Sequence, residues 1–566
     1  MSTIIEESTL SEVEQIKADS LGLRGPLQDE VANDETHLTE AAKQILKFHG
    51  SYQQEDRDVR RERKKAGLEP AYSFMIRSKL PGGAMTAEQY LLHDRITDQY
   101  GDSSLRITTR QGFQLYGVVK QDLRNTIHEL NAAMVTTFGA CGDVVRNVVT
   151  CPAPLPGGNR QKMIKLAREI AFATLPRSRS YHDIWVEGQQ VTTSEAPVAD
   201  PLYLDRYLPR KFKVGFAFPD DNCTDVFSND LGYVVIEEEG EIVGYNVLVG
   251  GGYGMTHGKT ETMARLASPL GFAKPDELLE LTKAVIAVQR DHGNRENRRL
   301  ARMKYLIEAR GVDWFRERVE ENLGRPLAPY RPVEVDGIED HLGWHDQGDG
   351  RWFLGVWVEN GRVKDDGDFR LRTALRTIVE EFQTDVHLTT QQNLLLTNVQ
   401  AADRERIDAI LSEHGVVSID GISPTRRWAM ACPALPTCPL AVAESERVLP
   451  QILDELDIAL ARLGLNREAL AVRMTGCPNG CARPYTADLA FVGRSLGKYM
   501  VYVGGNLEGT RLGDVYADLI PLGDLVETVR PLLERFANER SEEEGFGDFW
   551  RRVGLVPLPM KTRAAR

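Results

Sequence analysis

The chain of 566 residues has few cysteines, no long hydrophobic run and no excess of basic residues. Seven cysteines, a small and odd number for this length, argue against a secreted scaffold held by disulfides. No stretch of about 18 apolar residues occurs, so no membrane-spanning helix is expected. The 69 Lys and Arg face 83 Asp and Glu, which gives a net charge of −14. This balance disfavours a general nucleic-acid or anionic-membrane surface, but it leaves room for a local basic pocket.

The first residues also lack the features of a targeting segment. The sequence MSTIIEESTLSEVEQIKADS carries acidic residues where a secretory signal peptide has basic ones, and no apolar segment follows. It is not the arginine-rich, acid-poor pattern of an organelle transit peptide either. We therefore expect a cytoplasmic protein, in which thiols stay reduced and free to bind metal.

The composition is that of a globular protein, with 42% hydrophobic and 27% charged residues. At roughly 150 residues per domain, the length suggests about four domains or fewer large ones. Residues 1–66 are highly charged and predict either a solvated helical arm or a partner-docking segment. The body begins with AYSFMIRSKLPGG (71–83), a strand-like run that Pro and Gly end.

Three pairs of sequence blocks repeat in the same order along the chain, which indicates a gene duplication and a pseudo-twofold body. The pairs are 107–118 with 388–399, 149–154 with 430–435, and 245–252 with 499–506. In the second pair Cys151 corresponds to Cys432. The offset falls from 281 to 254 residues, so the second copy is about 27 residues shorter between these points.

Apolar periodicity predicts helices between the strand-like blocks. The expected helical stretches are 86–100, 265–290, 371–383 and 446–463. Strand, helix and strand follow one another in both halves, which predicts an α+β or α/β body with two equivalent sheets. Residues 326–346 are rich in Pro, Gly and Asp and form the expected join between the halves.

Four of the seven cysteines lie close together in the sequence, in the strings ACPALPTCPL and TGCPNGCARP. Cys432 and Cys438 are separated by five residues, Cys477 and Cys481 by three, and the two pairs by 38. Neighbouring Pro and Gly favour tight turns that aim several sulfur atoms at one centre. Four thiolates are the ligand set of an iron–sulfur cluster or a structural zinc, and zinc sites usually have closer spacing. Four independent buried cysteines are the alternative without a metal.

TGCPNGCARP, together with ACPALPTCPLA, resembles the sirohaem-dependent sulfite and nitrite reductases, most of all the haemoprotein (beta) subunit of assimilatory sulfite reductase. The resemblance extends from KFHGSYQQEDRD (47–58) to EGFGDFWRRVGL (544–555). It implies a [4Fe-4S] cluster with the ligands Cys432, Cys438, Cys477 and Cys481. It further implies that Cys481 bridges to the sirohaem iron as its axial ligand.

The resemblance also implies an α+β fold, duplicated and pseudo-twofold, with two ferredoxin-like half-domains and two mixed α/β domains for sirohaem and the cluster. The implied domains are an N-terminal arm (1–66), a first ferredoxin-like half-domain (67–143), a first sirohaem- and substrate-binding domain (144–335), a second ferredoxin-like half-domain (344–420) and a second domain with the cluster and the axial cysteine (421–566). The implied activity is the six-electron reduction of sulfite to sulfide in sulfate assimilation and cysteine biosynthesis.

An anionic substrate and a cofactor rich in carboxylates need basic residues, and the first half supplies them. By resemblance, the residues that line the sulfite pocket are Arg77, Arg146, Lys211 and Lys213, and those that hold sirohaem carboxylates are Arg106 and Arg110. The two lysines are two positions apart, so on a strand they share one face. Arg302 and Lys304, in the basic stretch 295–305, are further candidates for sirohaem carboxylates. For each of the first six residues the alternative is a solvated surface charge. For Arg302 and Lys304 the alternative is a position on a solvated helix face.

The two halves differ in these basic positions. Gln391 stands where the first half has Arg110, and the other basic residues are not retained. The first half is therefore expected to supply the anion pocket and the second half the cluster. The nitrite branch of the family tends to have Asn at the position of Lys213, so Lys here favours sulfite, with side activity on nitrite.

The electron donor is expected to be a separate protein. No G-x-G-x-x-G motif lies in a βαβ unit, and GGGYG (250–254) has no Rossmann pattern around it. The resemblance favours an NADPH-dependent flavoprotein alpha subunit as the partner. The alternative donor is ferredoxin, which would make the protein a ferredoxin-dependent sulfite reductase or a ferredoxin-nitrite reductase. Cys141 lies where some ferredoxin-dependent relatives have a cysteine bonded to a tyrosine, and Tyr52 is the matching tyrosine. A [4Fe-4S] electron carrier or a zinc-stabilised structural protein is the competing interpretation, but neither needs the basic pocket.

Overall fold

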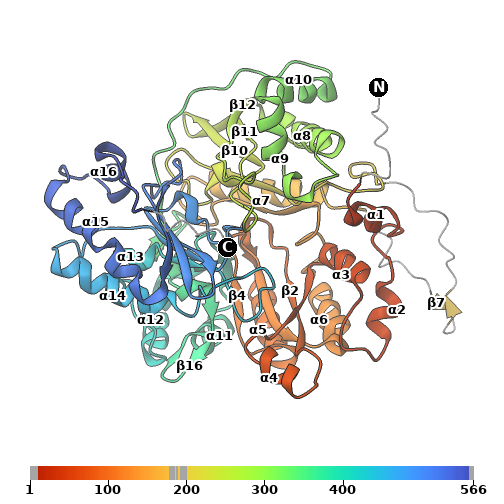
Figure 1. Ribbon diagram of the computed structural model, residues 1–566, viewed down its shortest axis with the longest axis horizontal. Coiled ribbons are helices and arrows are strands. Elements are labelled where there is room, and N and C mark those ends of the chain that lie inside the picture. Colours follow the sequence, from red (N-terminus) through yellow and green to blue (C-terminus); the bar gives the residue numbers. More distant parts are fainter. Residues whose placement is uncertain (1–9, 178–184, 187–188, 191–199, 560–566) are drawn as a thin grey trace.

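The duplication is visible in the sheets of the computed structural model, which describes residues 10–177, 185–186, 189–190 and 200–559 (Figure 1). Four five-stranded sheets form two pairs, and the members of each pair have the same strand order. Within the described residues, no helix has the length and apolar character needed to cross a membrane.

The first pair consists of two antiparallel sheets that exchange a strand. Antiparallel sheet 1 has the order β1 (Ser51–Glu55), β2 (Tyr72–Arg77), β5 (Phe113–Val118), β4 (Leu105–Ile107) and β15 (Arg362–Val363). Antiparallel sheet 2 has the order β13 (Gly343–Asp346), β14 (Arg351–Val356), β19 (Leu394–Gln400), β18 (Asp385–Leu388) and β3 (Ala84–Met85). Each sheet thus takes its last strand from the other half of the chain.

The second pair consists of two mixed sheets with parallel and antiparallel strands. Mixed sheet 1 has the order β6 (Val145–Val149), β9 (Phe212–Ala217), β10 (Leu231–Glu238), β11 (Glu241–Val249) and β12 (Ser268–Ala273). Mixed sheet 2 has the order β20 (Met430–Ala431), β21 (Val472–Thr475), β22 (Leu489–Ser495), β23 (Lys498–Val503) and β24 (Asp514–Pro521). In each, the first three strands run parallel, so their carboxyl ends meet at one edge.

Helices pack around these four sheets, and two small hairpins complete the described structure. The helices of the first half are α1 (Glu12–Ala18), α2 (Leu27–Ala32), α3 (Glu40–Leu46), α4 (Arg60–Lys65), α5 (Ala87–Tyr100), α6 (Lys120–Ala132), α7 (Asn159–Ala173), α8 (Leu278–His292), α9 (Met303–Arg310) and α10 (Val312–Leu323). Those of the second half are α11 (Leu371–Phe382), α12 (Arg404–Glu413), α13 (Pro424–Arg427), α14 (Leu449–Arg462), α15 (Leu525–Glu539) and α16 (Phe546–Val553). The hairpins pair β7 (Trp185–Val186) with β8 (Gln189–Gln190) and β16 (Asp365–Asp366) with β17 (Phe369–Arg370).

Most of the expected secondary structure is present. The repeated blocks form equivalent strands, and three of the four expected helices are α5, α11 and α14. The fourth expectation, a helix over 265–290, is wrong in its first part, because residues 268–273 form the edge strand β12. Pro269 and Gly271 disfavour a helix there, and a proline is tolerated on an edge strand. The helix begins only at Leu278.

The described part of the expected N-terminal arm, residues 10–66, packs against the body at several points. β1 pairs with β2, so the first antiparallel sheet begins before residue 67. Lys17 is fully buried and its Nζ donates to the carbonyl of Leu208 at 2.8 Å. The Arg57 guanidinium donates to the carbonyls of Cys438 and Ala441 at 3.0 and 2.7 Å. This segment is therefore integrated into the body and contacts a loop of the second half.

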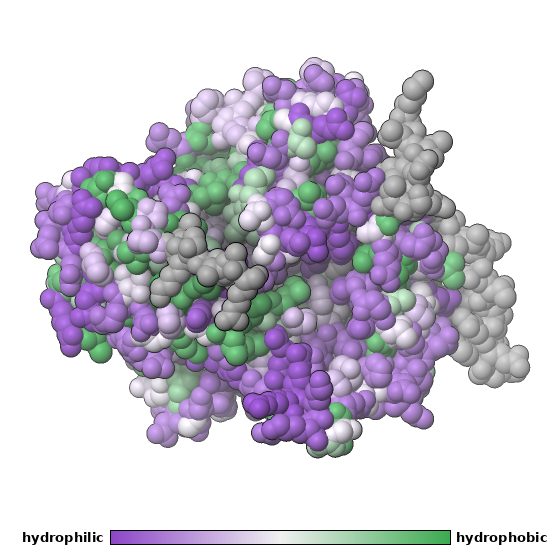
Figure 2. All heavy atoms as spheres, in the orientation of Figure 1, coloured by the Kyte–Doolittle hydropathy of each residue, from purple (hydrophilic) through white to green (hydrophobic). Residues whose placement is uncertain are grey.

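The hydrophobic cores follow the same division. One large cluster lies around mixed sheet 1 and another around mixed sheet 2. A third is shared between the antiparallel sheets and joins, for example, Phe74 and Ile107 of the first half to Leu388 and Leu394 of the second. Hydrophilic residues cover most of the face in Figure 2, and hydrophobic ones gather mainly around its centre. The shared core makes the two halves one body.

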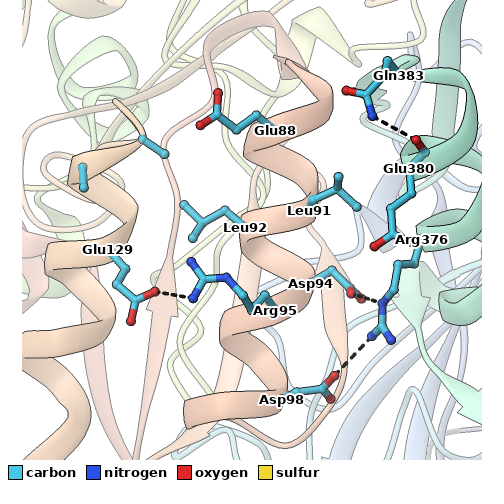
Figure 3. Close-up of a pocket in the computed structure, with 12 residues that line it drawn as sticks. Glu88, Leu91, Leu92, Asp94, Arg95, Asp98, Glu129, Arg376, Glu380 and Gln383 are labelled. Carbon is cyan, nitrogen blue, oxygen red and sulfur yellow. Dashed lines mark hydrogen bonds and ion pairs between the residues drawn. The ribbon is translucent and has the colours of Figure 1, made fainter.

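A network of ion pairs reinforces the contact between the halves at helices α5 and α11 (Figure 3). The buried carboxylate of Asp94 accepts a hydrogen bond from Arg372 at 2.6 Å and one from Arg376. Asp98, one turn later, pairs with the same two arginines, but its side chain is 47% exposed. Such a buried pair is costly to break from one side, because the remaining charge loses its partner.

We predict different effects of neutralising these two aspartates. Asp94→Asn should destabilise the protein by about 3 kcal/mol, because it leaves buried guanidinium charge unpaired. The matched control Asp98→Asn should cost less than about 1 kcal/mol, since water screens its ion pairs. The midpoint of urea unfolding measures both. Equal shifts for the two variants would contradict the importance of Asp94.

Candidate functional site

Strand topology brings the four clustered cysteines of the second half together. Cys432 directly follows β20, and Cys477 follows β21 after one residue. The two strands are parallel neighbours, so both cysteines emerge at the same edge of mixed sheet 2. The backbone N–H of Cys432 donates to the carbonyl of Met474 at 3.2 Å, which continues this pairing past the strand end.

Glycines allow the TGCPNGC loop to approach its surroundings closely. A Cβ on Gly476 would lie 2.5 Å from the carbonyl oxygen of Ala443 and 2.6 Å from the Ala434 side chain. Gly480 has a φ of +64°, in the left-handed region that favours glycine, and a Cβ there would lie 2.8 Å from the Tyr485 ring. The loop conformation that presents the sulfur atoms therefore depends on both glycines.

The thiols of this cluster stay protonated unless a cation lies near them. Burial raises the pKa of Cys432, Cys438 and Cys477, to about 11 for Cys438, and the neighbouring Cys481 sulfur raises all three further. Hydrogen bonds from the Gly476 amide to Cys432 Sγ, at 3.3 Å, and from Asn479 to Cys477 Sγ, at 3.4 Å, favour the thiolate form. Several thiolates this close need a cationic centre to balance their charge.

The spacing of these sulfur atoms distinguishes between the two kinds of metal centre. All four cysteines belong to the described part of the chain, and no three of their sulfur atoms lie within 4.8 Å of one another. A single tetrahedral zinc, with Zn–S bonds of about 2.3 Å, would bring its sulfur ligands to about 3.8 Å from one another. The wider arrangement fits a cluster of several metal atoms better than a single zinc ion.

Cys481 is near both the other three cysteines and a group of basic side chains. It is the exposed member of the four. Its sulfur is close enough to Arg77, Lys211 and Lys213 to favour the charged form of each. Its carbonyl accepts a hydrogen bond from Thr109 Oγ1 of the first half at 3.2 Å. The site therefore forms where the two halves meet.

Lys211 and Lys213 enter the site from one strand, as their spacing predicts. Lys213 is the second residue of β9, and Lys211 immediately precedes that strand. Burial, together with the nearby Arg110 and Arg302, lowers the pKa of Lys213 to about 7. Burial and neighbouring cations also hold the pKa of Lys211 well below its ordinary value. An anion bound here would favour the charged form of both lysines.

Arg77 and Arg146 lie in the same site, around Tyr52 and Cys141. Arg77 Nη1 donates to Cys141 Sγ at 3.1 Å, and its guanidinium carbon lies 6.0 Å from the centre of the Tyr52 ring. Arg146 is held by the carbonyls of Gly142 and Ala140 at 2.8 and 3.2 Å. Burial, with the nearby Cys141, raises the pKa of Tyr52. The tyrosine and the cysteine are thus neighbours, and their covalent bond stays a prediction.

The arginines expected to hold cofactor carboxylates already have partners within the protein. Arg106 is buried and forms an ion pair with Glu446 at 2.9 Å, and it donates to the carbonyl of Ala431 at 2.7 Å. Arg110 donates to Asn229 Oδ1 and the Val214 carbonyl, both at 2.7 Å. Arg106 thus contacts the second half, whereas these partners of Arg110 belong to the first. The carboxylate contacts expected of both arginines stay predictions.

Arg302 and Lys304 are buried rather than on a solvated helix face. Two nitrogens of Arg302 donate to the two carboxylate oxygens of Asp230 at 3.0 and 2.8 Å. Lys304 Nζ donates to the carbonyls of Gly252 and Gly254 at 3.1 and 2.8 Å. The alternative of a solvated face is therefore wrong, and the structure gives both residues a role in holding the loop after β11.

Two acidic residues that the sequence analysis did not single out organise this basic region. Asp230 binds Arg302 and also accepts from the backbone N–H of Lys213 at 2.9 Å. Glu446 binds both Arg106 and Arg362, the latter at 2.7 Å. The repeat contained a hint of the first, because an Asp-Leu pair begins the same strand in each half, β10 and β22. The sequence gives no comparable hint for Glu446.

Comparison with known proteins extends over nearly the whole chain. Residues 167–327 and 423–560 match the family described as the nitrite and sulphite reductase 4Fe-4S domain. Residues 68–133 and 345–414 match the nitrite/sulfite reductase ferredoxin-like half domain. Both descriptions match twice, once in each half, as the duplicated sheets require.

The chain matches curated relatives over almost their full length. The chain is 45% identical over 549 residues to the sulfite reductase [NADPH] hemoprotein beta-component of Paenibacillus sp. (strain JDR-2), covering 96% of each chain. It is also 45% identical over 576 residues to the sulfite reductase [ferredoxin] of Synechococcus elongatus, covering 99% of this chain and 92% of that protein. The two relatives differ in the electron donor that their names give.

A solved structure shows the same fold. The Mycobacterium tuberculosis NirA protein superposes with a TM-score of 0.76 over 96% of both chains, at 24% sequence identity. This likeness concerns the fold alone, and the family matches and curated relatives carry the assignment. The chain belongs to the nitrite and sulfite reductase family, with two ferredoxin-like half-domains and two 4Fe-4S domains.

Proposed function

We propose that this chain is the haemoprotein of an assimilatory sulfite reductase, which reduces sulfite to sulfide with six electrons. The observation that carries the proposal is the position of Cys481. Its sulfur is close enough to the other three cysteines to raise their pKa values. It is also close enough to Arg77, Lys211 and Lys213 to favour their charged forms. A cysteine in this position suits a bridge between an electron-storing cluster and a site that binds an anion.

The residues present fit both cofactors of this enzyme class. The four cysteines would hold the [4Fe-4S] cluster, and sirohaem would lie beside Cys481. Among the described residues, the buried Nε atoms of Arg77 and Arg110 have no hydrogen-bond partner, as expected at a site that takes a polar ligand. When bound, the two cofactors supply single electrons to the substrate.

The chain's own residues would bind the substrate and donate protons to it. Arg77, Arg146, Lys211 and Lys213 offer positive charge to the oxygens of sulfite, and this charge also polarises the S–O bonds. With a pKa of about 7, Lys213 Nζ releases a proton more readily than an ordinary lysine. It is therefore suited to protonate each departing oxygen. Two lysines in the pocket match sulfite, the more highly charged substrate, better than nitrite.

We propose an NADPH-dependent flavoprotein as the electron donor. The relative from Paenibacillus supports this donor by its name. Ferredoxin is the second candidate, supported by the equally similar relative from Synechococcus and by the proximity of Tyr52 and Cys141.

The roles of paired cysteines in the two halves can be separated by mutation. Cys432→Ala should lose most of the iron and acid-labile sulfide, because a buried cluster ligand is removed. Its counterpart in the repeat, Cys151→Ala, should retain both, since it lies outside the cluster. Metal analysis and the optical spectrum of the purified variants measure this. Equal loss of iron in both variants would contradict the assignment of the cluster.

Lys213→Met should retain the sirohaem absorption bands but lower the turnover of sulfite about 100-fold, because it removes a cation and a proton donor. The control is Lys165→Met, at an exposed position of α7, which should keep wild-type activity. Reduced methyl viologen serves as a donor that needs no protein partner, and sulfide formation is measured. Unchanged turnover in Lys213→Met would refute the role of this lysine.

The donor can be tested directly with the holoenzyme. An NADPH-dependent flavoprotein should support faster sulfide formation than reduced ferredoxin at equal concentration. The methyl viologen activity of the same preparation serves as the control for intact cofactors. Faster reduction with ferredoxin would replace the flavoprotein by the second candidate and leave the assignment as sulfite reductase unchanged.

A further inference from the structure

A second group of potential metal ligands lies outside the site described above. It consists of Cys151, Asp221, Cys223 and His341, and their ligand atoms all lie within 4.8 Å of one another. All four side chains are almost fully buried, with exposed fractions between 0 and 2%. Two cysteines, an aspartate and a histidine together are not the usual content of a hydrophobic interior. We name this group the Cys151 quartet.

Three segments bring the quartet together. Cys151 lies just past the end of β6, and Asp221 and Cys223 lie in the turn after β9. These strands are parallel neighbours, so the segments meet at the same edge of mixed sheet 1. His341 comes from the segment that joins the two halves. A hydrogen bond from the backbone N–H of Asn222 to the carbonyl of Gly337, at 2.8 Å, also attaches that segment to the turn after β9.

The distances within the quartet suit a single tetrahedral ion. His341 Nε2 lies 3.3 Å from Cys151 Sγ and 3.0 Å from Asp221 Oδ2. Around zinc, with bonds of about 2.0–2.3 Å, neighbouring ligand atoms lie about 3.3–3.8 Å apart. A neutral imidazole nitrogen has one hydrogen or one lone pair, so it cannot satisfy two acceptors at once, whereas a metal ion would engage all the groups together.

The charges around the quartet also suit a divalent cation. Two thiolates and a carboxylate would leave one negative charge in excess of a divalent ion. Arg160 supplies the balancing charge, since its guanidinium lies 3.8 Å from Asp221 Oδ2 and stacks on Phe218 with 4.4 Å to the ring centre.

The quartet occupies the place in the first half that the cysteine cluster occupies in the second. Cys151 and Cys432 follow equivalent strands, β6 and β20, and Cys223 lies in the turn that corresponds to that of Cys481. Contacts across the halves repeat as well. Thr109 Oγ1 donates to the carbonyl of Cys481 at 3.2 Å, and Thr390 Oγ1 to that of Cys223 at 2.5 Å.

We propose that the Cys151 quartet binds one zinc ion, at the pseudo-twofold counterpart of the iron–sulfur site. The four ligands complete a tetrahedron and are buried, so the ion has no open position and is structural. It fastens the segment between the halves to mixed sheet 1. The proposal is independent of the reaction that the other site performs.

The test is the zinc content of the purified holoenzyme, with X-ray absorption at the zinc edge, which iron does not obscure. We expect about one zinc per chain, with two sulfur neighbours at about 2.3 Å and two nitrogen or oxygen neighbours at about 2.0–2.1 Å. Cys223→Ala and His341→Ala should lose the zinc but keep the iron. The control Cys141→Ala removes a buried cysteine outside the quartet and should keep the zinc.

Several results would overturn the proposal. One is wild-type protein that holds no zinc and takes up none from added Zn²⁺, and another is an absorption spectrum without sulfur neighbours. Retention of zinc in both quartet variants would also overturn it. So would a disulfide between Cys151 and Cys223, detected by mass spectrometry. If the variants do not fold, the zinc content and the absorption spectrum of the wild-type protein decide alone. Wild-type protein that contains zinc but no iron would instead contradict the function proposed for the other site.

Discussion

The site depends on the burial of several positive charges next to one cysteine. Arg77, Lys211 and Lys213 lie around Cys481, and Arg302 adds to the positive potential although Asp230 binds it directly. Half-buried cations gathered this closely repel one another unless negative charge accompanies them. Cys481, bound to a metal as a thiolate, would supply part of it. An anionic cofactor and an anionic substrate would supply the rest, so binding and the stability of the pocket favour the same occupants.

This arrangement requires both halves of the chain. The basic residues come from the first half and the cysteines from the second. The antiparallel sheets hold the halves in register by exchanging β3 and β15 and by sharing one hydrophobic core. Glu446 of the second half binds Arg106 of the first within the same contact. A shift of one half against the other would therefore separate the sulfur ligands from the charges that surround them.

The sequence predicted the parts of this structure that local patterns encode. The repeat predicted the equivalent strands, which the structure has. That the four cysteines share one centre and that Lys211 and Lys213 share one face stay predictions. The sequence could not predict the exchanged strands, because pairing between distant segments leaves no local pattern. The edge strand β12 was mistaken for part of a helix, and the buried role of Lys17 was hidden in a charged segment. Asp230 and Glu446 were missed because their importance depends on partners far away in the sequence.

Duplication explains why the same edge of the mixed sheet gathers potential metal ligands in both halves. In each half, parallel strands deliver their following loops to the same edge, and a cysteine follows the first strand in both. The second half adds Cys438 and Cys477, and among the described residues no three of its four clustered sulfur atoms lie within 4.8 Å of one another. The first half lacks these two and instead draws in His341 from the connecting segment and Asp221 from the turn. With shorter distances and harder ligands, the same topology favours a single borderline cation such as zinc over a cluster. The fold thus sets where ligands meet, and the identity of two or three loop residues sets which metal they fit.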